Sequence, residues 1–175
     1  MKKVGIIIGS TRDTRKGYKI GEWVFNEVSD TLNQFNIIDL KEVDLVHYNE
    51  PSSPMSSSGY KHTSTKNWSK IVSEYDSFIF VTPEYNGFFT GALKDAIDYL
   101  YHEWKNKSYI IVGYGGRGAK NAAGHLESLL NRFEMVNIGN IAISQPWTSL
   151  QEDGSILKDY IDGDIKELVN KLIKK

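Results

Sequence analysis

The residues from Phe78 to Asp98, FIFVTPEYNGFFTGALKDAID, decide the fold class of this chain. Phe78 to Val81 is apolar throughout, which indicates a strand buried on both faces of a sheet. Asn86-Gly87 is a strong turn signal, and Thr90 is a suitable N-cap for the helical pattern that follows it. The stretch therefore predicts a strand–loop–helix unit of the kind that builds parallel sheets.

The same alternation continues in both directions along the chain. Strands are predicted at 4–8, 35–40, 78–81 and 109–112 and within 135–144, the last with a bend near Gly139-Asn140. Helical stripes of apolar residues are predicted from Ile20 to Leu32, Trp68 to Tyr75, Leu93 to Tyr101, Ala119 to Phe133 and Ile161 to Ile173. Strict strand–helix alternation predicts one α/β domain over residues 1–175, a parallel sheet with helices on both faces.

Composition narrows the classes of function. The formal net charge of −1 lacks the basic excess of nucleic-acid-binding proteins. The chain has no cysteine, which excludes disulfides, thiol nucleophiles and thiolate metal sites. The apolar run after Met1 is too short for a signal peptide, and no window has the roughly 20 apolar residues of a membrane helix. We therefore expect a cytoplasmic protein that binds neither nucleic acid nor membrane.

One segment breaks the alternation. Residues 41–66 contain Pro51, Pro54, Gly59 and a cluster of serines, without a clear period. Long irregular segments in compact domains are usually functional or mobile. We interpret this one as a loop that borders the site or a subunit contact.

The loop after the first strand, GSTRDTRKG from Gly9 to Gly17, has the composition of an anion site. Backbone N–H groups at a helix start, together with hydroxyl and guanidinium groups, suit a phosphate monoester. The alternative is an ordinary turn with a helix cap and solvated arginines. The candidate donors are Ser10, Thr11, Arg12, Thr14 and Arg15.

The loops after the third and fourth strands suit a flat heterocycle. Tyr85, Phe88 and Phe89 place rings beside the backbone donors of the turn, and Gly113 to Gly118 lets the backbone approach a ligand closely. Taken alone, the loop after the third strand is better explained as a strand-to-helix turn with inward-packing aromatics. The alternative for the loop after the fourth strand is a flexible surface turn. Ligands bind beyond the carboxyl ends of parallel strands, so we expect all three loops to border one crevice.

With these segments in view, the chain resembles the NADPH-dependent FMN reductase family, flavodoxin-like enzymes that include azo-, quinone- and chromate-reducing members. The resemblance runs from Val4 to about Trp147 and is most specific from Thr82 to Gly87. It implies a flavodoxin-like, doubly wound three-layer αβα fold with a five-stranded parallel sheet in the order 2-1-3-4-5. It also implies bound FMN and NADPH or NADH as co-substrate.

The resemblance implies three groups of FMN contacts. The phosphate would lie at the first loop, the isoalloxazine at the second, and the edge and face of the ring at the third. These residues are Gly9, Ser10, Thr11, Arg12, Arg15, Gly17 and Tyr18; Pro83, Glu84, Tyr85, Asn86 and Gly87; and Gly113, Tyr114, Gly115 and Gly116.

The flavin would supply the chemistry, so no catalytic side chain and no metal are expected. Glu84 could act as a general base, but a hydrogen bond that fixes its loop is the preferred interpretation. His125 could support the site from the neighbouring helix, although a surface position is the simpler expectation. We expect a small-molecule electron acceptor and a homodimer or homotetramer, because a second subunit often walls such shallow crevices.

Two other functions remain open on the sequence alone. A non-enzymatic FMN carrier would bind the flavin tightly without oxidising a nicotinamide. A transferase acting on a nucleotide or sugar phosphate would use the first loop alone. A low-molecular-weight phosphatase is excluded because the chain has no cysteine.

Overall fold

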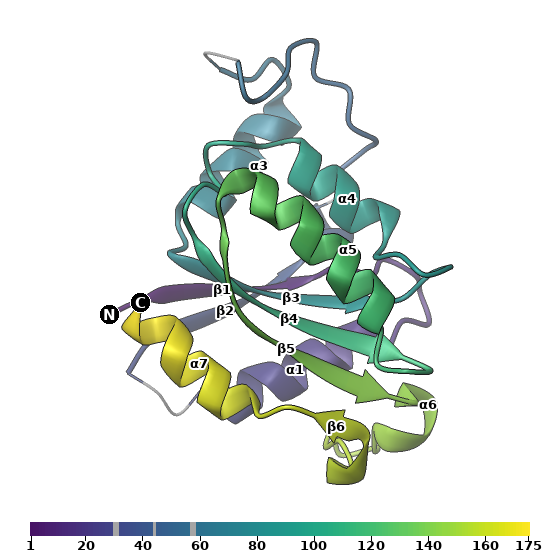
Figure 1. Cartoon of the computed structure of the whole chain (residues 1–175). Helices are drawn as coiled ribbons and strands as arrows, with labels where there is room; N and C mark the ends of the chain where they lie inside the picture. Colours follow the sequence, from purple (N-terminus) through teal and green to yellow (C-terminus); the bar gives the residue numbers. More distant parts are fainter. Residues whose placement is uncertain (30–31, 44, 57–58) are drawn as a thin grey trace.

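A single six-stranded sheet forms the centre of the molecule. The computed structural model describes residues 1–29, 32–43, 45–56 and 59–175 (Figure 1). The strand order is β2-β1-β3-β4-β5-β6, and all neighbours are parallel except β5 and β6. The predicted order 2-1-3-4-5 is confirmed, and a short antiparallel edge strand is added to it. The strands are β1 (Lys3–Ile8), β2 (Gln34–Asp39), β3 (Ser77–Pro83), β4 (Ser108–Gly115), β5 (Val136–Ser144) and β6 (Ile161–Asp162).

Helices cover both faces of the sheet, which gives the three layers predicted for the fold. On one face lie α1 (Gly17–Val28) and α7 (Ile165–Lys174), and on the other lie α3 (Thr63–Ser73), α4 (Gly91–Asp98) and α5 (Lys120–Leu130) (Figure 1). Short helical turns complete the chain: α2 (Leu40–Val43), η1 (Asn131–Phe133), α6 (Pro146–Ser149) and η2 (Lys158–Tyr160). No helix in the described ranges is long and apolar enough to cross a membrane.

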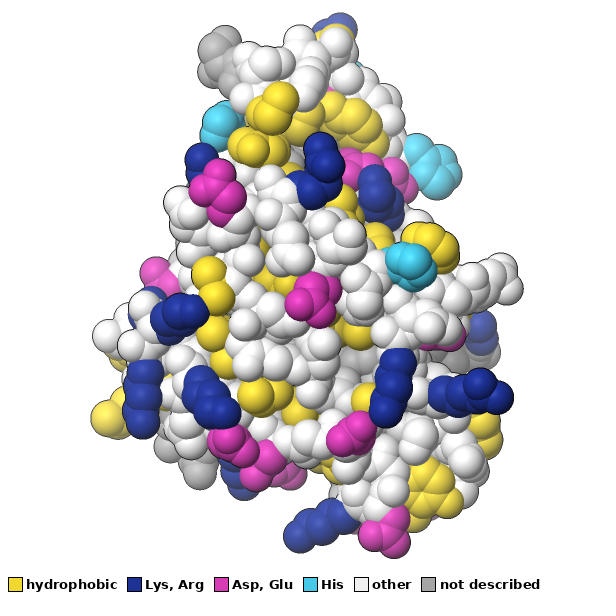
Figure 2. Space-filling model, viewed as in Figure 1, with side chains coloured by type: hydrophobic (Ala, Val, Ile, Leu, Met, Phe, Trp, Pro, Cys, Tyr) yellow, Lys and Arg dark blue, Asp and Glu magenta, His cyan; other side chains and the backbone are white. Residues whose placement is uncertain are grey.

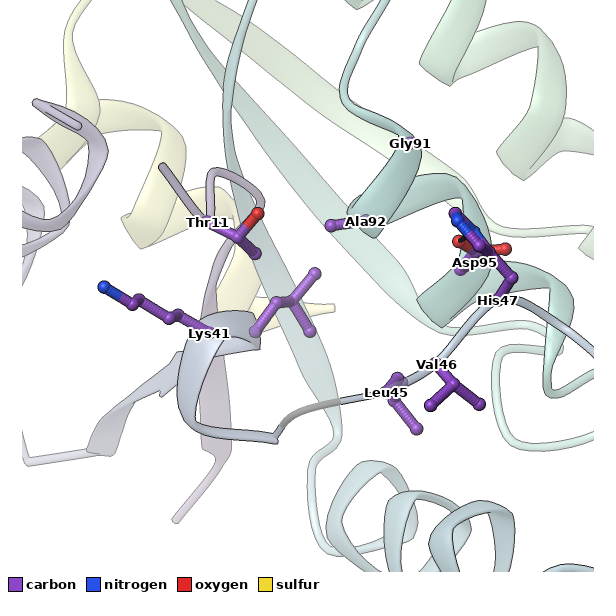
Figure 3. Close-up of a pocket in the computed structure, with 9 residues that line it drawn as sticks. Thr11, Lys41, Leu45, Val46, His47, Gly91, Ala92 and Asp95 are labelled. Atoms are coloured by element: carbon purple, nitrogen blue, oxygen red, sulfur yellow. Dashed lines mark hydrogen bonds and ion pairs between the residues drawn. The ribbon is translucent and has the colours of Figure 1, made fainter. Parts of the chain in front are cut away.

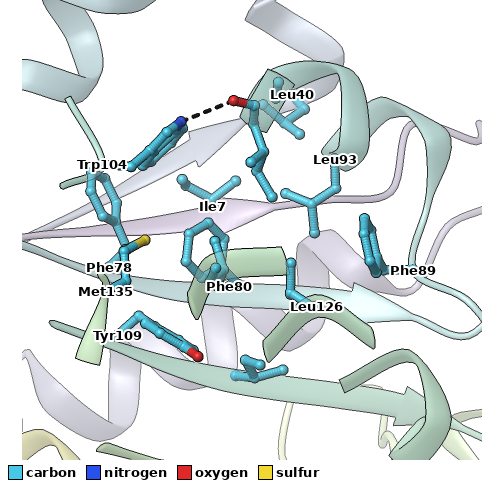
Figure 4. Packing of buried hydrophobic residues seen from close by; sticks show 14 of the residues in the cluster. Ile7, Leu40, Phe78, Phe80, Phe89, Leu93, Trp104, Tyr109, Leu126 and Met135 are labelled. Atoms are coloured by element: carbon cyan, nitrogen blue, oxygen red, sulfur yellow. Dashed lines mark hydrogen bonds between the residues drawn. The ribbon is translucent and has the colours of Figure 1, made fainter. Parts of the chain in front are cut away.

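The two layers of core explain why the strands are apolar without alternation. Phe78 and Phe80 point to the α3–α4–α5 side (Figure 4). Ile79 and Val81 belong to the cluster on the other face, with residues of α1 and α7. Because both faces are covered by helices, successive residues of β3 are all buried. The two tryptophans on the α3–α4–α5 side both donate their indole N–H groups to backbone carbonyls. Trp68 Nε1 donates to the Ala96 carbonyl at 2.7 Å, and Trp104 Nε1 donates to the Ile97 carbonyl at 3.1 Å.

The bend predicted in the fifth strand is present as a register shift in β5. The β4–β5 pairing passes from Asn137 to Gly139 while its partners are consecutive residues. Gly139 has a φ of 152°, and a Cβ on it would lie 2.6 Å from Leu168 Cδ2. Glycine is therefore required there by both backbone conformation and packing against α7.

Several expectations about element boundaries are wrong. Helix α1 ends at Val28, and Leu32 is exposed rather than part of its apolar face. Helix α4 ends at Asp98, so Leu100 and Tyr101 follow it although Leu100 is buried. Ile161 belongs to β6, not to the closing helix. Tyr75 likewise follows the end of α3, and Phe133 lies in η1 beyond α5. Leu40 begins α2 instead of ending β2. Each helix error assigns an apolar residue at helical spacing to a helix that does not include it.

The irregular segment 41–66 is partly helical at its two ends, in α2 and α3, and residues 44, 57 and 58 within it lie outside the described residues. One carboxylate holds its middle part to α4, and another connects two parts of the segment to each other. Asp95 accepts from the Tyr48 N–H at 3.1 Å, and Glu50 accepts from the N–H groups of Lys61 and His62, both at 2.9 Å. The segment is therefore fixed by polar contacts and by scattered apolar residues that pack on the core, such as Leu45 and Tyr60, without a periodic apolar face. This explains its lack of pattern.

Candidate functional site

The loops after β1, β3 and β4 meet at the carboxyl edge of the sheet around a cavity of about 270 Å³. We call it the inter-loop cavity. The structure thus brings together the three segments that the sequence singled out. Its lining residues are Arg12, Thr14, Arg15, Lys16, Pro83, Glu84, Tyr85, Tyr114, Gly115, Gly116, Pro146 and Trp147.

Two of the charged side chains that line the cavity already have partners within the protein. The Arg15 guanidinium forms an ion pair with Asp39 at 2.5 Å and donates to the Ser10 carbonyl at 3.0 Å. Glu84 is engaged by helix α5. Arg12 and Lys16 have no ion pair among the described residues, so two free cations remain at this end of the cavity.

Buried side chains beneath the first loop hold it to the end of β4. Ser10 is fully buried, and its Oγ accepts a hydrogen bond from the Tyr114 hydroxyl at 3.0 Å. A Cβ on Gly17 would lie 2.2 Å from that same Oγ and 2.5 Å from the Tyr114 hydroxyl oxygen, so only glycine fits. Burial raises the pKa of Tyr114 to about 12, against a smaller lowering by the bond to Ser10. The Tyr114 hydroxyl is therefore a neutral structural donor at ordinary pH.

The second loop forms a two-residue hairpin. Tyr85 and Phe88 exchange backbone hydrogen bonds of 2.8 and 3.1 Å, and the residues between them, Asn86 and Gly87, have φ values of 53° and 84°. Positive φ at both positions is the type I′ geometry for which Asn-Gly is preferred. Neither the Asn86 nor the Gly87 N–H has a hydrogen-bond partner within the described part of the chain. The turn therefore carries two free donors beside Tyr85.

Residues flanking this hairpin connect it to the other loops. The Arg12 guanidinium lies over the Tyr85 ring, 5.8 Å from its centroid. Thr90 caps α4 by accepting from the Leu93 N–H at 3.1 Å and donates its own proton to the Gly9 carbonyl. The predicted helix cap is confirmed, and the same hydroxyl joins the first and second loops.

Glu84 performs the loop-fixing role preferred from the sequence. One of its carboxylate oxygens accepts from the N–H groups of Asn121 and Ala122, both at 3.1 Å. These donors belong to the first turn of α5, where a negative charge is stabilised by unpaired N–H groups and the helix dipole. The contact joins the second loop to the helix that follows the glycine loop.

The glycine loop leaves its backbone open to the cavity at two positions. A Cβ on Gly115 or Gly116 would meet other atoms only at 3.8 and 3.7 Å, so these residues border free space. Gly113 is different: a Cβ there would lie 2.9 Å from the Gly118 carbonyl oxygen, so this glycine permits the loop itself to close. Arg117 points to another cavity, which it shares with Asp159 and Asp162.

Several predicted residues lie next to the cavity without lining it: Gly9, Ser10, Thr11, Gly17, Tyr18, Asn86, Gly87 and Gly113. Pro146 and Trp147 line it and were not predicted, because they follow β5 in a segment without apolar periodicity. His125 is exposed on α5 and stacks on the Phe88 ring with centroids 3.9 Å apart, so the surface position expected for it is confirmed.

A larger cavity of about 600 Å³ lies on the other side of the first loop, between α2 and α4 (Figure 3). We call it the α4 cavity. Thr11 is its one contribution from the predicted site, and Lys41 in its wall is paired with Asp13 at 2.7 Å. Asp95 adds a carboxylate to the same wall. Without a free cation, this cavity suits an anionic ligand less well than the inter-loop cavity does.

One face of the molecule shows no large area of a single charge. On the face seen in Figure 2, basic and acidic side chains are interspersed without a large area of one sign.

The residues present fit FMN on three counts. Arg12 and Lys16 supply charge for a phosphate, the open backbone at Gly115 and Gly116 leaves room for a ring edge, and the hairpin at Tyr85 offers free N–H groups beside an aromatic ring. Each feature comes from a different loop. Arg12, Lys16, Gly115, Gly116 and Tyr85 line one cavity, and the two free N–H groups follow Tyr85 directly in the chain.

Comparisons with known proteins agree with this chemistry. The family model of NADPH-dependent FMN reductase matches residues 2–148. The chain is 36% identical over 155 residues to an NAD(P)H-dependent FMN reductase of Saccharomyces cerevisiae, covering 82% of this chain and 81% of that protein. It is 31% identical over 171 residues to another from Nectria sp, covering 94% and 85%.

Solved structures share the fold. The flavoenzyme NAD(P)H:(acceptor) oxidoreductase FerB of Paracoccus denitrificans superposes with a TM-score of 0.70 at 23% identity, covering 99% of this chain and 94% of that one. The apo form of an NADH:FMN oxidoreductase superposes with a TM-score of 0.65 at 17% identity, covering 99% and 87%.

These matches confirm the resemblance identified in the sequence, and with it the oxidoreductase class, FMN as cofactor and NAD(P)H as co-substrate. The chain belongs to the NADPH-dependent FMN reductase family.

Proposed function

We propose that this chain binds FMN in the inter-loop cavity, reduces it with NAD(P)H and passes the electrons to a flavin, quinone, azo compound or similar small acceptor. The observation that carries the assignment to this cavity is its charge balance. Arg15 and Glu84 are satisfied within the protein, which leaves Arg12 and Lys16 available to a dianionic phosphate.

The phosphate would be held by Arg12, Lys16 and Thr14. Arg15 has a supporting role in this proposal: its bond to the Ser10 carbonyl and its ion pair with Asp39 hold the loop in shape. Ser10 is buried beneath the loop, where it receives the Tyr114 proton, so it positions the backbone rather than facing the cavity. This refines the contacts that the resemblance implies.

The ring would lie between the hairpin and the glycine loop. FMN, when bound, supplies the hydride and electron transfer chemistry. Tyr85 and Pro83 offer an apolar wall, and the free N–H groups of Asn86 and Gly87 would donate to a ring nitrogen. Backbone at Gly115 and Gly116 would approach the pyrimidine edge, where donors stabilise negative charge.

No side chain is assigned as a general acid or base. Glu84, the only carboxylate in the cavity wall among the described residues, uses one oxygen for two hydrogen bonds to α5. Its role is to hold the second loop against the helix that follows the third.

The experiment is a visible absorption spectrum of the purified protein after incubation with FMN, repeated after anaerobic addition of NADPH and then of each acceptor. Bound flavin that bleaches with NADPH and reoxidises with a quinone, an azo dye or free flavin supports the proposal and ranks the acceptors. Bound flavin that does not bleach would instead identify a carrier. Failure to bind FMN would reject the assignment altogether.

Variants locate the flavin. Replacing Arg12 or Lys16 by Ala should raise the Kd for FMN about tenfold each, because a charge-assisted phosphate contact contributes about 1.5 kcal/mol or more. Arg132→Ala in η1 is the matched control, since it removes an exposed arginine that does not line the cavity. Equal affinities for all variants would place FMN elsewhere.

The proposal includes assembly and location. We propose a cytoplasmic homodimer or homotetramer, for which two exposed apolar residues offer contact surface: Phe88 of the hairpin and Val46 of the α4 cavity. Light scattering of the FMN-loaded protein checks the assembly, and a monomeric mass would contradict it.

A further inference from the structure

Trp147 is the only tryptophan of the chain with a largely exposed side chain. Its residue is 62% exposed, whereas Trp68 and Trp104 are fully buried and Trp23 is 8% exposed. Large aromatic side chains left in solvent lose the free energy that burial would give them, which makes such residues candidates for ligand contact.

The exposed indole lies in the wall of the inter-loop cavity. Trp147 and Pro146 of α6 line it together with Tyr114, Gly115 and Gly116 of the glycine loop. The Trp147 Cη2 atom lies 3.7 Å from the position that a Cβ on Gly116 would take. The indole therefore packs beside the bare backbone of Gly116 and faces the same space.

The backbone holds this indole in place through a conformation that costs free energy. Gln145, which precedes α6, has a φ of 46°, in the left-handed region that side chains rarely adopt. Proline at the next position restricts its conformation further. Non-glycine residues in sparsely populated regions persist where the surrounding structure enforces them, often at ligand sites.

Hydrogen bonds fix the turn to the glycine loop. The Gln145 N–H donates to the Gly115 carbonyl at 2.9 Å, and the Gln145 carbonyl accepts from the N–H groups of Thr148 and Ser149 at 2.8 and 2.9 Å. The buried Ser149 hydroxyl donates to the Ser144 carbonyl at 3.0 Å. The position of Trp147 is thus set relative to the same loop that borders the expected ring edge.

We propose that Trp147 is a flavin-binding residue, whose indole contacts the part of FMN beside Gly116 and shields it from water. This inference rests on the proposed function, because it assigns the inter-loop cavity to FMN. It adds a contact from the segment after β5, which joins the three loops already described and closes the cavity on a further side.

Two substitutions test the contact. Trp147→Ala should raise the Kd for FMN about tenfold, as expected for the loss of an aromatic contact with a planar ligand. Trp147→Phe keeps a ring and should remain within about threefold of the unaltered protein. Because Trp147 is exposed, neither change should disturb folding, which thermal denaturation of the FMN-free protein checks.

Indole N–H resonances give a readout that does not depend on activity. In ¹⁵N-correlated NMR spectra, the Trp147→Phe variant identifies the Trp147 cross-peak. Trp68 and Trp104 serve as internal references, since their N–H groups are buried and bonded to carbonyls of α4. Addition of FMN should shift the Trp147 peak far more than these two.

The outcomes separate this inference from the proposed function. If the protein binds FMN, Arg12→Ala weakens binding, and yet Trp147→Ala binds normally with an unmoved Trp147 peak, the inference is overturned and the cavity assignment stands. A raised KM for the acceptor with unchanged FMN binding would also overturn it, because Trp147 would then contact the acceptor. If Arg12→Ala leaves FMN binding unchanged, the cavity assignment itself fails.

Discussion

The Tyr114 hydroxyl donates a hydrogen bond to the Ser10 hydroxyl at 3.0 Å, and both residues are buried at the carboxyl edge of the sheet. Ser10 follows β1 and Tyr114 lies at the end of β4, with β3 between these strands. One side-chain contact therefore ties the expected phosphate loop to the glycine loop. The geometry of the inter-loop cavity depends on this connection.

Removal of the Tyr114 hydroxyl should loosen the first loop. Tyr114→Phe leaves the Ser10 hydroxyl without its donor, so we expect the free energy of unfolding to fall by about 1 kcal/mol. Affinity for FMN should fall several-fold because the loop is less well positioned. Chemical denaturation and flavin titration measure the two effects, and an unchanged Kd would mean that the loop is held by other contacts.

Tyr114 should also make the free energy of unfolding depend on pH in the alkaline range. Burial raises the pKa of Tyr114 from 10.0 to about 12, so the folded state retains the proton more tightly than the unfolded state does. This contribution is complete below about pH 10 and is lost as pH rises through about 12. Between about pH 9 and 12, the stability of the unaltered protein should fall by about 2 kcal/mol more than that of Tyr114→Phe.

The comparison with the Phe variant isolates Tyr114, since other buried tyrosines such as Tyr99 and Tyr109, whose pKa values burial also raises, are present in both proteins. Parallel stability curves for the two proteins across this range would contradict the assignment of a buried, neutral hydroxyl.

Gly17 should not tolerate a methyl group. In Gly17→Ala the new Cβ would overlap the Ser10 and Tyr114 hydroxyl oxygens, so we expect destabilisation of roughly 1–3 kcal/mol and weak FMN binding. Gly124→Ala in α5 is the matched control: its Cβ meets nothing within 4 Å, and it should stabilise by about 0.5–1 kcal/mol through helix propensity. Thermal melts of both variants decide the point, and equal effects would argue against the close contact.

The ion pair of Arg15 and Asp39 should be structural. Both side chains are about nine-tenths buried, at 10% and 8% exposure, so Asp39→Asn leaves a guanidinium without its counter-charge. We expect the free energy of unfolding of Asp39→Asn to fall by about 3 kcal/mol. The double variant Arg15→Met, Asp39→Leu should lose less, because it leaves no buried charge unpaired. Denaturant titration of the single and double variants tests this order, and a double variant less stable than Asp39→Asn would refute it.

Glu84 should act on stability and on the position of the second loop. Glu84→Ala removes the acceptor of two α5 N–H groups, and we expect the free energy of unfolding to fall by about 1 kcal/mol. Glu84→Gln retains an acceptor oxygen, so its free energy of unfolding should fall less than that of Glu84→Ala. Reduction of bound flavin by NADPH should continue in Glu84→Gln, and its abolition in stopped-flow measurements would instead favour the general base role.

The sheet could be predicted from the sequence because its strands are short, apolar and separated by helical patterns. Phe78 to Val81 is buried on both faces, as its composition indicates. The meeting of the three loops also follows from topology, since the ends of parallel strands share one edge of the sheet.

Two features of the inter-loop cavity could not be predicted from the sequence: the ion pair that engages Arg15, and the contribution of Trp147 to the cavity wall. Arg15 is engaged by Asp39 because β1 and β2 pair in a register that sets Ile8 against Asp39, and a sequence does not show this register. Trp147 lies in a one-turn helix whose position depends on the left-handed backbone of Gln145. No periodic pattern marks either feature.

A crystal structure of the protein with FMN tests the central claim most directly. The account predicts the phosphate against Arg12 and Lys16, and the ring between the Asn86-Gly87 turn and the backbone of Gly115 and Gly116. Flavin density in the α4 cavity beside Thr11 and Asp95, or on another face of the molecule, would contradict it.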